Sequence, residues 1–213
     1  MRLTPELLLK AYSIGIFPMA ESRDDPELHW IDPEKRGVLP FDGFHVPRRL
    51  KRLLRKGIYE VTCDKAFHEV VLACAGPTTQ RPESWINPVI ERLVVQLYHM
   101  GFAHSVETRA GDRLVGGLYG IALGGCFFGE SMYSRERDAS KVALVNLVLR
   151  LRKGGFRLLD TQFTTPHLRR FGVIEISRAE YRRQLAKAVG VAATFPTGPI
   201  RQEELTAFLE SCL

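Results

Sequence analysis

Hydrophobic residues recur at intervals of three and four along much of the chain, which is the spacing of one face of an α-helix. Most of these segments open with a capping residue or a proline and stop near a glycine, as helices do. In the first of them, Thr4-Pro5 precedes an apolar stripe that stops at Gly15. Helices are predicted to begin near Thr4, Pro47, Asp64, Asn87, Asp138 or Ser140, Thr165 and Ser177, with a loop and a short helix after Gly190.

Short runs rich in β-branched and aromatic residues separate these helices and predict strands. The runs cover residues 58–62, 103–107, 114–122, 126–132, 156–160 and 173–176, and a loop is predicted from Gly76 to Glu83. From residue 58 the predicted order is therefore β-α-α-β-β-β-α-β-α-β. This is the element order of the GNAT acyltransferase fold, an α+β arrangement in which helices flank a mixed, twisted sheet.

The first forty residues do not continue that pattern. After the first helix, Pro18, Pro33 and Pro40 and the polar stretch from Glu21 to Glu27 leave room only for short elements. We therefore predict a small N-terminal domain over residues 1–40 and a GNAT-like domain over residues 41–213.

The composition is that of a globular protein, with 213 residues, 45% of them hydrophobic and 25% charged. The longest apolar runs, such as Val142–Val145, are far shorter than a membrane span, and no signal-peptide pattern opens the chain. The four cysteines lack the paired spacing of a zinc site. These features predict a cytoplasmic protein with reduced cysteines, and a monomer is expected.

Cations outnumber acids by 30 to 24, and they are clustered. The densest cluster lies on the predicted helix 47–56, whose leucines would face the core while its cations face outward. Its members are Arg48, Arg49, Lys51, Arg52, Arg55 and Lys56. Phosphate groups of a nucleic acid suit such unpaired cations best, and a solvated charged face is the alternative. Two further groups repeat the bias: Arg150, Arg152, Lys153 and Arg157, then Arg178, Arg182, Arg183 and Lys187.

Several kinds of chemistry find no support in the sequence. GNAT enzymes hold the pyrophosphate of acyl-coenzyme A on a glycine-containing loop, but the matching segment here, Ser131–Ser140, contains no glycine. The six histidines are scattered without metal-ligand spacing. Ser131 does not lie in the GxSxG turn of a serine hydrolase. We therefore expect neither a metal nor coenzyme A.

A series of motifs resembles the leucyl/phenylalanyl-tRNA–protein transferase family. The motifs follow one another in order from about residue 3 to about residue 188. They are Thr4-Pro5 through Pro18, Trp30 with Asp32-Pro33 and Arg36-Gly37, Trp85-Ile86, Gly101–Glu107, Leu114–Gly120, Phe127–Ser134, Ala139-Ser140-Lys141 and Leu159–Gln162. The chain departs from the family at Arg109, where the family often has Trp.

The resemblance implies a small N-terminal domain beside a GNAT-like domain and an aminoacyl transfer that needs neither metal, ribosome nor coenzyme A. The implied donor is tRNA charged with Leu or Phe, and Met less well. The implied acceptor is the α-amino group of a protein that begins with Arg or Lys, and the product enters N-degron degradation. The basic clusters would then contact tRNA phosphates without reading sequence.

The resemblance also implies roles for single residues. Asp160 and Gln162, which share one face of a predicted strand, would lie near the attacking amine as the catalytic pair. Gln162 would orient the amine and Asp160 would polarise Gln162; a helix cap is the alternative for Asp160. Glu130 and Ser131 would line the donor site, since a carboxylate in an apolar strand needs a cationic or N–H partner. An ion pair with Arg135 or Lys141 is the alternative for Glu130.

The remaining implied residues are apolar. Phe127, together with Met132 or Leu147, would line a pocket for the Leu or Phe side chain, although such residues are as often part of a core. Trp30 and Trp85, the two tryptophans, would bracket the terminal adenosine of the tRNA by stacking. The alternative for both is a hydrophobic contact between domains.

Three other functions share some of these features. An acetyl-coenzyme A-dependent GNAT acetyltransferase lacks the glycine loop it needs. A transferase that adds Leu to N-terminal Asp or Glu would need a basic acceptor site, whereas Glu130 and Asp160 are acidic. A non-catalytic tRNA-binding module would share the cations but gives no reason for the set of Glu130, Asp160 and Gln162.

Overall fold

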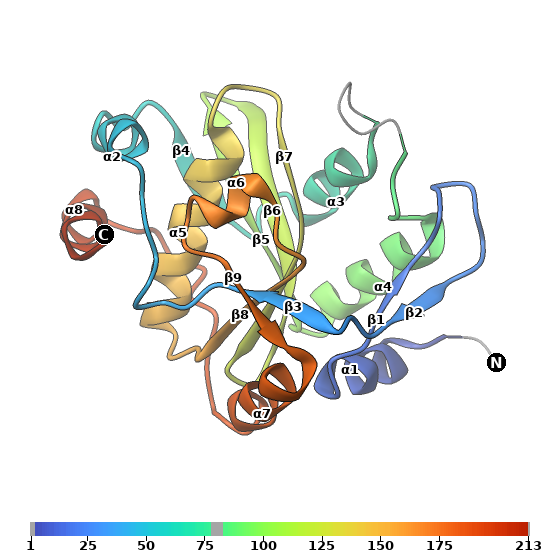
Figure 1. Cartoon of the computed structure of the whole chain (residues 1–213). Helices are drawn as coiled ribbons and strands as arrows, with labels where there is room; N and C mark the ends of the chain where they lie inside the picture. The colour runs from blue at the N-terminus through green and yellow to red at the C-terminus, as the bar shows by residue number, and fades with distance from the viewer. Residues whose placement is uncertain (1–2, 78–82, 213) are drawn as a thin grey trace.

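The computed structural model describes residues 3–77 and 83–212 (Figure 1). The helices are α1 (Pro5–Ser13), α2 (Arg48–Arg55), α3 (Phe67–Ala75), α4 (Pro88–His99), α5 (Ala139–Lys153), α6 (Pro166–Arg169), α7 (Arg178–Val189) and α8 (Gln202–Ser211). The strands are β1 (Phe17–Met19), β2 (His29–Ile31), β3 (Lys35–Val38), β4 (Glu60–Cys63), β5 (Ala103–Ala110), β6 (Arg113–Leu123), β7 (Cys126–Ser134), β8 (Leu158–Gln162) and β9 (Ile174–Ser177). The order predicted from residue 58 onward is confirmed.

Within these residues, seven strands form one mixed sheet in the order β4-β5-β6-β7-β8-β3-β9. Neighbours from β4 to β7 are antiparallel, whereas β7 and β8 run parallel and are connected through α5, as a parallel pair requires. A separate pair of short strands, β1 and β2, forms a second small sheet. The fold is therefore the predicted α+β arrangement of a mixed sheet flanked by helices.

Strand β3 belongs to the large sheet although it comes from the first forty residues. It lies between β8 and β9 and is antiparallel to both. Gly37 makes this placement possible, because a Cβ at that position would lie 2.7 Å from the backbone of Phe163. The division of the chain at residue 40 stays a prediction, and the strand just before it is shared with the sheet of the second part.

Helices cover both faces of the sheet (Figure 1), and the buried side chains form two hydrophobic cores. Helices α1, α3, α4 and α7 contribute to one core, and α2, α5 and α8 contribute to the other. Helix α5 is buried along almost its whole length, because the sheet covers one side of it while α2 and α8 pack against it elsewhere. None of the helices in the described ranges is long and apolar enough to cross a membrane.

Local capping explains why most helices begin where the sequence predicts. The side-chain oxygens of Thr4, Asn87, Thr165 and Ser177 each accept a hydrogen bond from a first-turn amide. Asp64 is wrong as a cap: α3 follows Ala66, and the Asp64 carboxylate instead accepts a 2.8 Å hydrogen bond from the Ser105 amide. Helix α5 follows Asp138, whose side chain makes no capping bond. The predicted loop at 76–83 falls mostly outside the described residues.

Candidate active site

The two parallel strands in the middle of the sheet diverge, and a site is formed between them. β7 and β8 pair only at their beginnings, and the last paired positions are Phe128 and Asp160. Beyond these positions β7 continues beside β6, whereas β8 continues beside β3. The gap that opens is bordered by side chains from both strands and from the helices α5 and α6.

A β-bulge lies in β7 where the divergence begins. Gly129 is opposite Gly120 and Ser131 is opposite Tyr119, so that Glu130 is the extra residue of β7. A bulge changes the direction of a side chain and is common beside functional sites. It also changes the alternation of the strand, and residues on the two sides of Glu130 cannot be assigned to faces by simple counting.

A mostly apolar pocket of about 230 Å³ occupies the gap. Its lining residues come from β6, β7, α5, β8 and the segment around α6. They are Leu118, Tyr119, Gly129, Glu130, Ser131, Met132, Leu144, Leu147, Leu159, Thr161, Gln162, Thr165, His167 and Leu168. Glu130 and Gln162 thus place a carboxylate and an amide on the wall of an otherwise largely hydrophobic cavity.

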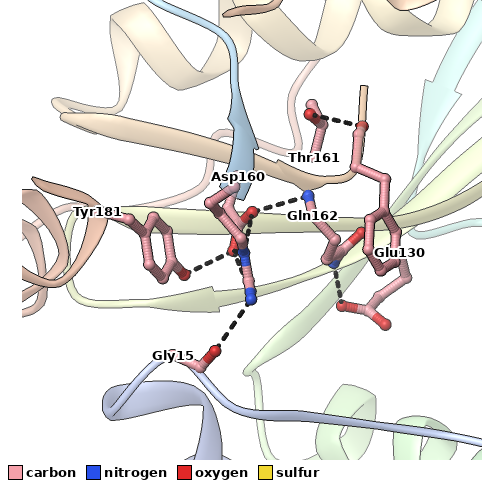
Figure 2. Close-up of polar contacts among 8 residues, drawn as sticks. Gly15, Glu130, Asp160, Thr161, Gln162 and Tyr181 are labelled. Carbon is pink, nitrogen blue, oxygen red and sulfur yellow. Dashed lines mark hydrogen bonds and ion pairs between the residues drawn. The ribbon is translucent and has the colours of Figure 1, made fainter. Parts of the chain in front are cut away.

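Gln162 ends β8 in an unusual backbone conformation. Its φ is +55°, in the left-handed region that residues other than glycine seldom adopt. The backbone N–H of Gln162 donates a 2.8 Å hydrogen bond to Asp160 Oδ1, and the side-chain Nε2 donates to Glu130 Oε1 at 3.2 Å (Figure 2). Backbone strain of this kind is typical of functional sites and persists where its surroundings enforce it. Here Asp160 enforces it.

Asp160 itself is fully buried and does not line the pocket. Arg36 on β3 donates to both of its carboxylate oxygens, with Nη2 at 2.6 Å from Oδ2, and the Tyr181 hydroxyl donates to Oδ2 at the same distance. Arg36 also donates to the Gly15 carbonyl at 2.9 Å and lies between the rings of Phe17 and Tyr181. The side chain of Asp160 therefore bonds to the backbone N–H of Gln162, and not to the carboxamide group of its side chain.

Glu130 has an environment that favours its protonated form. Burial raises the pKa of its carboxyl to about 8, and hydrogen bonds from Tyr12 and Gln162 oppose that rise in pKa. Neither of the ion-pair partners considered from the sequence is used: Arg135 donates to the Leu114 carbonyl, and Lys141 pairs with Asp138. The carboxylate thus faces the pocket without a cationic side chain as a direct partner among the described residues.

The structure does not place Phe127 in this pocket. Its ring packs with those of Phe156 and Phe195 at centroid distances of 6.3 and 5.6 Å, and the side chain is completely buried. Phe127 pairs with Leu159 where the two strands are still adjacent, so no gap exists at that level. Met132 and Leu147 do line the pocket, as does Ser131.

The tryptophans lie away from the pocket walls. Trp30 is on β2 and is 45% exposed, whereas Trp85 is partly buried against the core that contains α3 and α4. Both are close to the β1–β2 pair, because Trp30 is opposite Pro18 and the Trp85 carbonyl accepts a hydrogen bond from the Ala20 amide. The exposed Trp30 ring is available for stacking, and Trp85 is more strongly engaged in packing.

Sequence reasoning gave no role to several residues of this site. In the sequence Arg36 stands out only as part of a motif, and no local signal marks Tyr12 or Tyr181. In the described residues there is no group of three or more His, Cys, Asp or Glu side chains that could hold a metal ion.

Comparison with known proteins gives the family. A family model described as leucyl/phenylalanyl-tRNA protein transferase matches residues 38–186, and a model of the N-terminal domain of the same transferase matches residues 1–34. The chain belongs to this family. As a member of the leucyl/phenylalanyl-tRNA–protein transferases, it is an aminoacyltransferase.

Individual relatives agree with the family model. The leucyl/phenylalanyl-tRNA–protein transferase of Paramagnetospirillum magneticum is 58% identical over 193 residues, which cover 91% of this chain and 92% of the relative. That of Rhodospirillum rubrum is 56% identical, with 91% of each chain covered. The crystal structure of FemX matches with a TM-score of 0.53 at 12% identity, covering 81% of this chain and 66% of that one. This last similarity concerns the fold alone.

The predicted tRNA-binding helix of this transferase is only partly free to bind a ligand. Leu50 and Leu54 of α2 are buried, as predicted, and Arg48, Arg52, Arg55 and Lys56 are exposed. Arg49, although exposed, pairs with Asp138 at 2.8 Å, and Lys51 donates to the Cys212 carbonyl at 2.9 Å. The two other basic groups differ more from the prediction.

Most cations in those two groups already have partners within the transferase. Arg150 is fully buried and donates to the carbonyls of Pro196 and Gly198, and Lys153 pairs with Glu204. Arg178 and Arg182 both pair with Asp32. The interpretation of these groups as unpaired surface cations is therefore wrong for these four residues.

Proposed function

We propose that this chain transfers Leu or Phe, and Met less well, from charged tRNA to the α-amino group of proteins that begin with Arg or Lys. The product would be a substrate for N-degron degradation in the cytoplasm. The enzyme would be a monomer, and its site would be built on a sheet of the GNAT type. The observation that carries this proposal is the apolar pocket whose wall holds Glu130 and Gln162. The family to which the chain belongs supports it.

The pocket would hold the side chain of the esterified amino acid. Its volume of about 230 Å³ is below the range typical of sites for drug-sized ligands and suits a single side chain. Leu118, Met132 and Leu147 contribute apolar walls. Apolar contacts discriminate between side chains by only about 10- to 200-fold per methylene, which agrees with a site that accepts Leu, Phe and Met.

Gln162 and Glu130 would position the acceptor. The acceptor ammonium loses one proton to solvent before it attacks. The amine nitrogen then bonds to the ester carbonyl carbon, the bond from that carbon to the ribose oxygen breaks, and a second proton from the nitrogen passes to the departing oxygen, which leaves as the ribose hydroxyl. A carbonyl oxygen on Gln162 can accept a hydrogen bond from the amine. Glu130, whose Oε1 lies 3.2 Å from Gln162 Nε2, would ionise when the acceptor ammonium enters, because a cation beside a carboxyl lowers its pKa, and the carboxylate would then attract that positive charge. Asp160 would act indirectly, by fixing the backbone of Gln162.

The tRNA would be held by stacking and by phosphate contacts. Trp30 and Trp85 would bracket the terminal adenosine, where stacking is worth about 1–3 kcal/mol per base. The exposed cations of α2, which are Arg48, Arg52, Arg55 and Lys56, would contact phosphates of the acceptor stem. Arg49 and Lys51 belong to the same helix but already have partners.

The test is a transfer assay with radiolabelled Leu-tRNA and three peptides that begin with Arg, Asp or acetylated Arg. We expect label on the N-terminus of the first peptide only, and we expect Gln162→Ala to lower the rate at least tenfold with little change in tRNA affinity. Label on the Asp-initiated peptide would support the alternative transferase specificity. Binding of tRNA without any transfer would instead favour a binding module.

A further inference from the structure

A second hollow lies beside the pocket of the candidate active site. It has a volume of about 190 Å³ and lies between the start of α2, the start of α5 and α6. Its lining residues are Pro47, Arg49, Leu50, Asp138, Lys141, His167, Arg170 and Phe171. His167 also lines the apolar pocket, so the two hollows are adjacent.

The side chains of this second hollow are predominantly cationic. Arg49 and Lys141 both pair with Asp138, at 2.8 and 3.5 Å, which orients two cations around one carboxylate. Arg170 is exposed, and its guanidinium has no hydrogen-bond or ion-pair partner among the described residues. With three cations and one acid, the hollow carries a net positive charge without counting His167.

His167 reports the same positive environment. Its pKa is lowered by burial first, and then by the charges of Lys141 and Arg170. A neutral imidazole at this position can still donate one N–H bond to a bound group. The hollow therefore offers fixed positive charge, a free guanidinium and a further possible donor, which together form the recognition set for a phosphate.

We propose that this hollow binds a backbone phosphate near the 3′ end of the aminoacyl-tRNA. This assignment rests on the proposed function, in which the esterified side chain occupies the apolar pocket. The ester is carried by the terminal ribose, so the nearest phosphates of the donor must lie within one or two nucleotides of that pocket. The hollow with Lys141 and Arg170 is adjacent to it and has the required charge.

The position of the hollow also connects two parts of the proposed tRNA path. Pro47 and Arg49, at the start of α2, form one wall, and the exposed cations of the same helix continue from there. His167 of α6, which also lines the hollow, belongs to the aminoacyl pocket as well. A phosphate held between them links the ester site to the basic helix without any base contact, which suits an enzyme that accepts more than one tRNA.

The test compares two donor analogues that differ in backbone phosphates. Puromycin resembles an aminoacyl-adenosine and carries no phosphate, whereas cytidylyl-cytidylyl-puromycin adds two phosphodiesters. Dissociation constants are measured for the wild-type chain, for Lys141→Ala/Arg170→Ala, and for the control Lys10→Ala/Arg92→Ala. The control removes the same charge from α1 and α4, whose apolar residues belong to the other hydrophobic core.

We expect Lys141→Ala/Arg170→Ala to weaken binding of the dinucleotide-extended analogue by a factor of about ten or more and to leave binding of puromycin unchanged. The control should bind both analogues as the wild-type chain does. The salt dependence of binding of the extended analogue should become shallower by about 0.7 for each lost phosphate contact. Equal weakening of both analogues, or no weakening of either, would overturn the phosphate assignment while leaving the proposed function intact. Failure of the wild-type chain to bind either analogue would overturn both. Thermal unfolding of each variant checks that it is folded.

Discussion

The Arg36 guanidinium and the Asp160 carboxylate form a completely buried ion pair, although 124 positions separate them in the chain. The pair joins β3 to β8, and the Tyr181 hydroxyl and the Gly15 carbonyl complete its hydrogen bonds. Through the Asp160 carboxylate, the same pair holds the backbone of Gln162 in its left-handed conformation. The stability of the sheet and the geometry of the candidate site thus depend on one contact.

Arg36→Ala should destabilise the protein by about 3–5 kcal/mol, because it leaves a buried carboxylate without its partner. Arg36→Lys retains the charge but not the paired donors, and it should recover part of that loss. Denaturant unfolding measures both variants, and transfer assays at a temperature where each is folded should show a lower kcat with a smaller change in KM. Wild-type stability of Arg36→Ala would show that the pair does not contribute as described.

Glu130 should make stability depend on pH in a defined direction. Its pKa in the folded protein, about 8, lies above the value of about 4.3 expected in an unfolded chain, so the folded state binds more protons between these values. The stabilisation is complete below about pH 4.3 and is lost as the pH rises through about 8.

Glu130→Gln removes this titration and serves as the comparison. Glu130 as a residue is only partly buried, so we expect a moderate effect: from pH 5.5 to pH 8.5 the wild-type chain should lose about 1–2 kcal/mol relative to the variant. Denaturant midpoints at the two pH values give the difference, and the contributions of other titrating groups cancel. Parallel pH curves for the two proteins would contradict the raised pKa.

A larger side chain in the apolar pocket should change the choice of amino acid. Leu147→Phe adds volume to one wall of a cavity of about 230 Å³. We expect kcat/KM for Phe-tRNA to fall about tenfold or more relative to Leu-tRNA, because the bulkier substrate loses its space first. A matched change outside the pocket, Phe127→Leu, should lower stability without changing the ratio. An unchanged ratio for Leu147→Phe would place the amino acid elsewhere.

The exposed cations of α2 should control the salt dependence of tRNA binding. Replacing Arg52, Arg55 and Lys56 by Ala should reduce the slope of log K against log salt by about 0.9 for each phosphate contact that is lost. Lys51→Ala, whose amine is already engaged with the Cys212 carbonyl, should leave the slope unchanged. A triple variant with the wild-type slope would assign this face of the helix to solvent.

The two tryptophans should differ in what their loss affects. Trp30→Ala removes a side chain that is 45% exposed, so it should raise the KM for charged tRNA with little change in stability. Trp85→Ala should raise the same KM and also lower the unfolding free energy, because that ring packs against the core. If Trp30→Ala leaves the KM unchanged, its ring does not stack on the nucleotide.

The succession of helices and strands from residue 58 could be predicted, because periodicity, caps and glycines are local signals. The position of β3 could not: its partners β8 and β9 are more than a hundred residues away, and no local pattern encodes that pairing. Asp64 shows the same limit, since its carboxylate accepts from the Ser105 amide of the neighbouring strand β5 and not from the helix that follows it.

In the site, Glu130 was assigned to the donor side and Gln162 to the attacking amine, and the structure brings the two side chains into contact. Phe127 lies outside the pocket, because β7 and β8 are still paired at its level, and this pairing register cannot be read from the sequence. The bulge at Glu130 also places Phe127 and Met132 on the same face of the sheet, whereas the regular alternation of side chains along a strand would place them on opposite faces. The burial of Arg150 depends on carbonyls more than forty residues away, which a count of charges cannot reveal.

The insertion of β3 between β8 and β9 has a consequence for synthesis on the ribosome. β3 is synthesised early but pairs only with β8 and β9, so it can enter the sheet only after residues 158–177 have emerged. Contacts between segments so distant in sequence form slowly. Until β3 lies between β8 and β9, Asp160 has no arginine beside it and the backbone of Gln162 is not held. A prematurely terminated chain therefore cannot assemble this site, and transfer requires a nearly complete molecule.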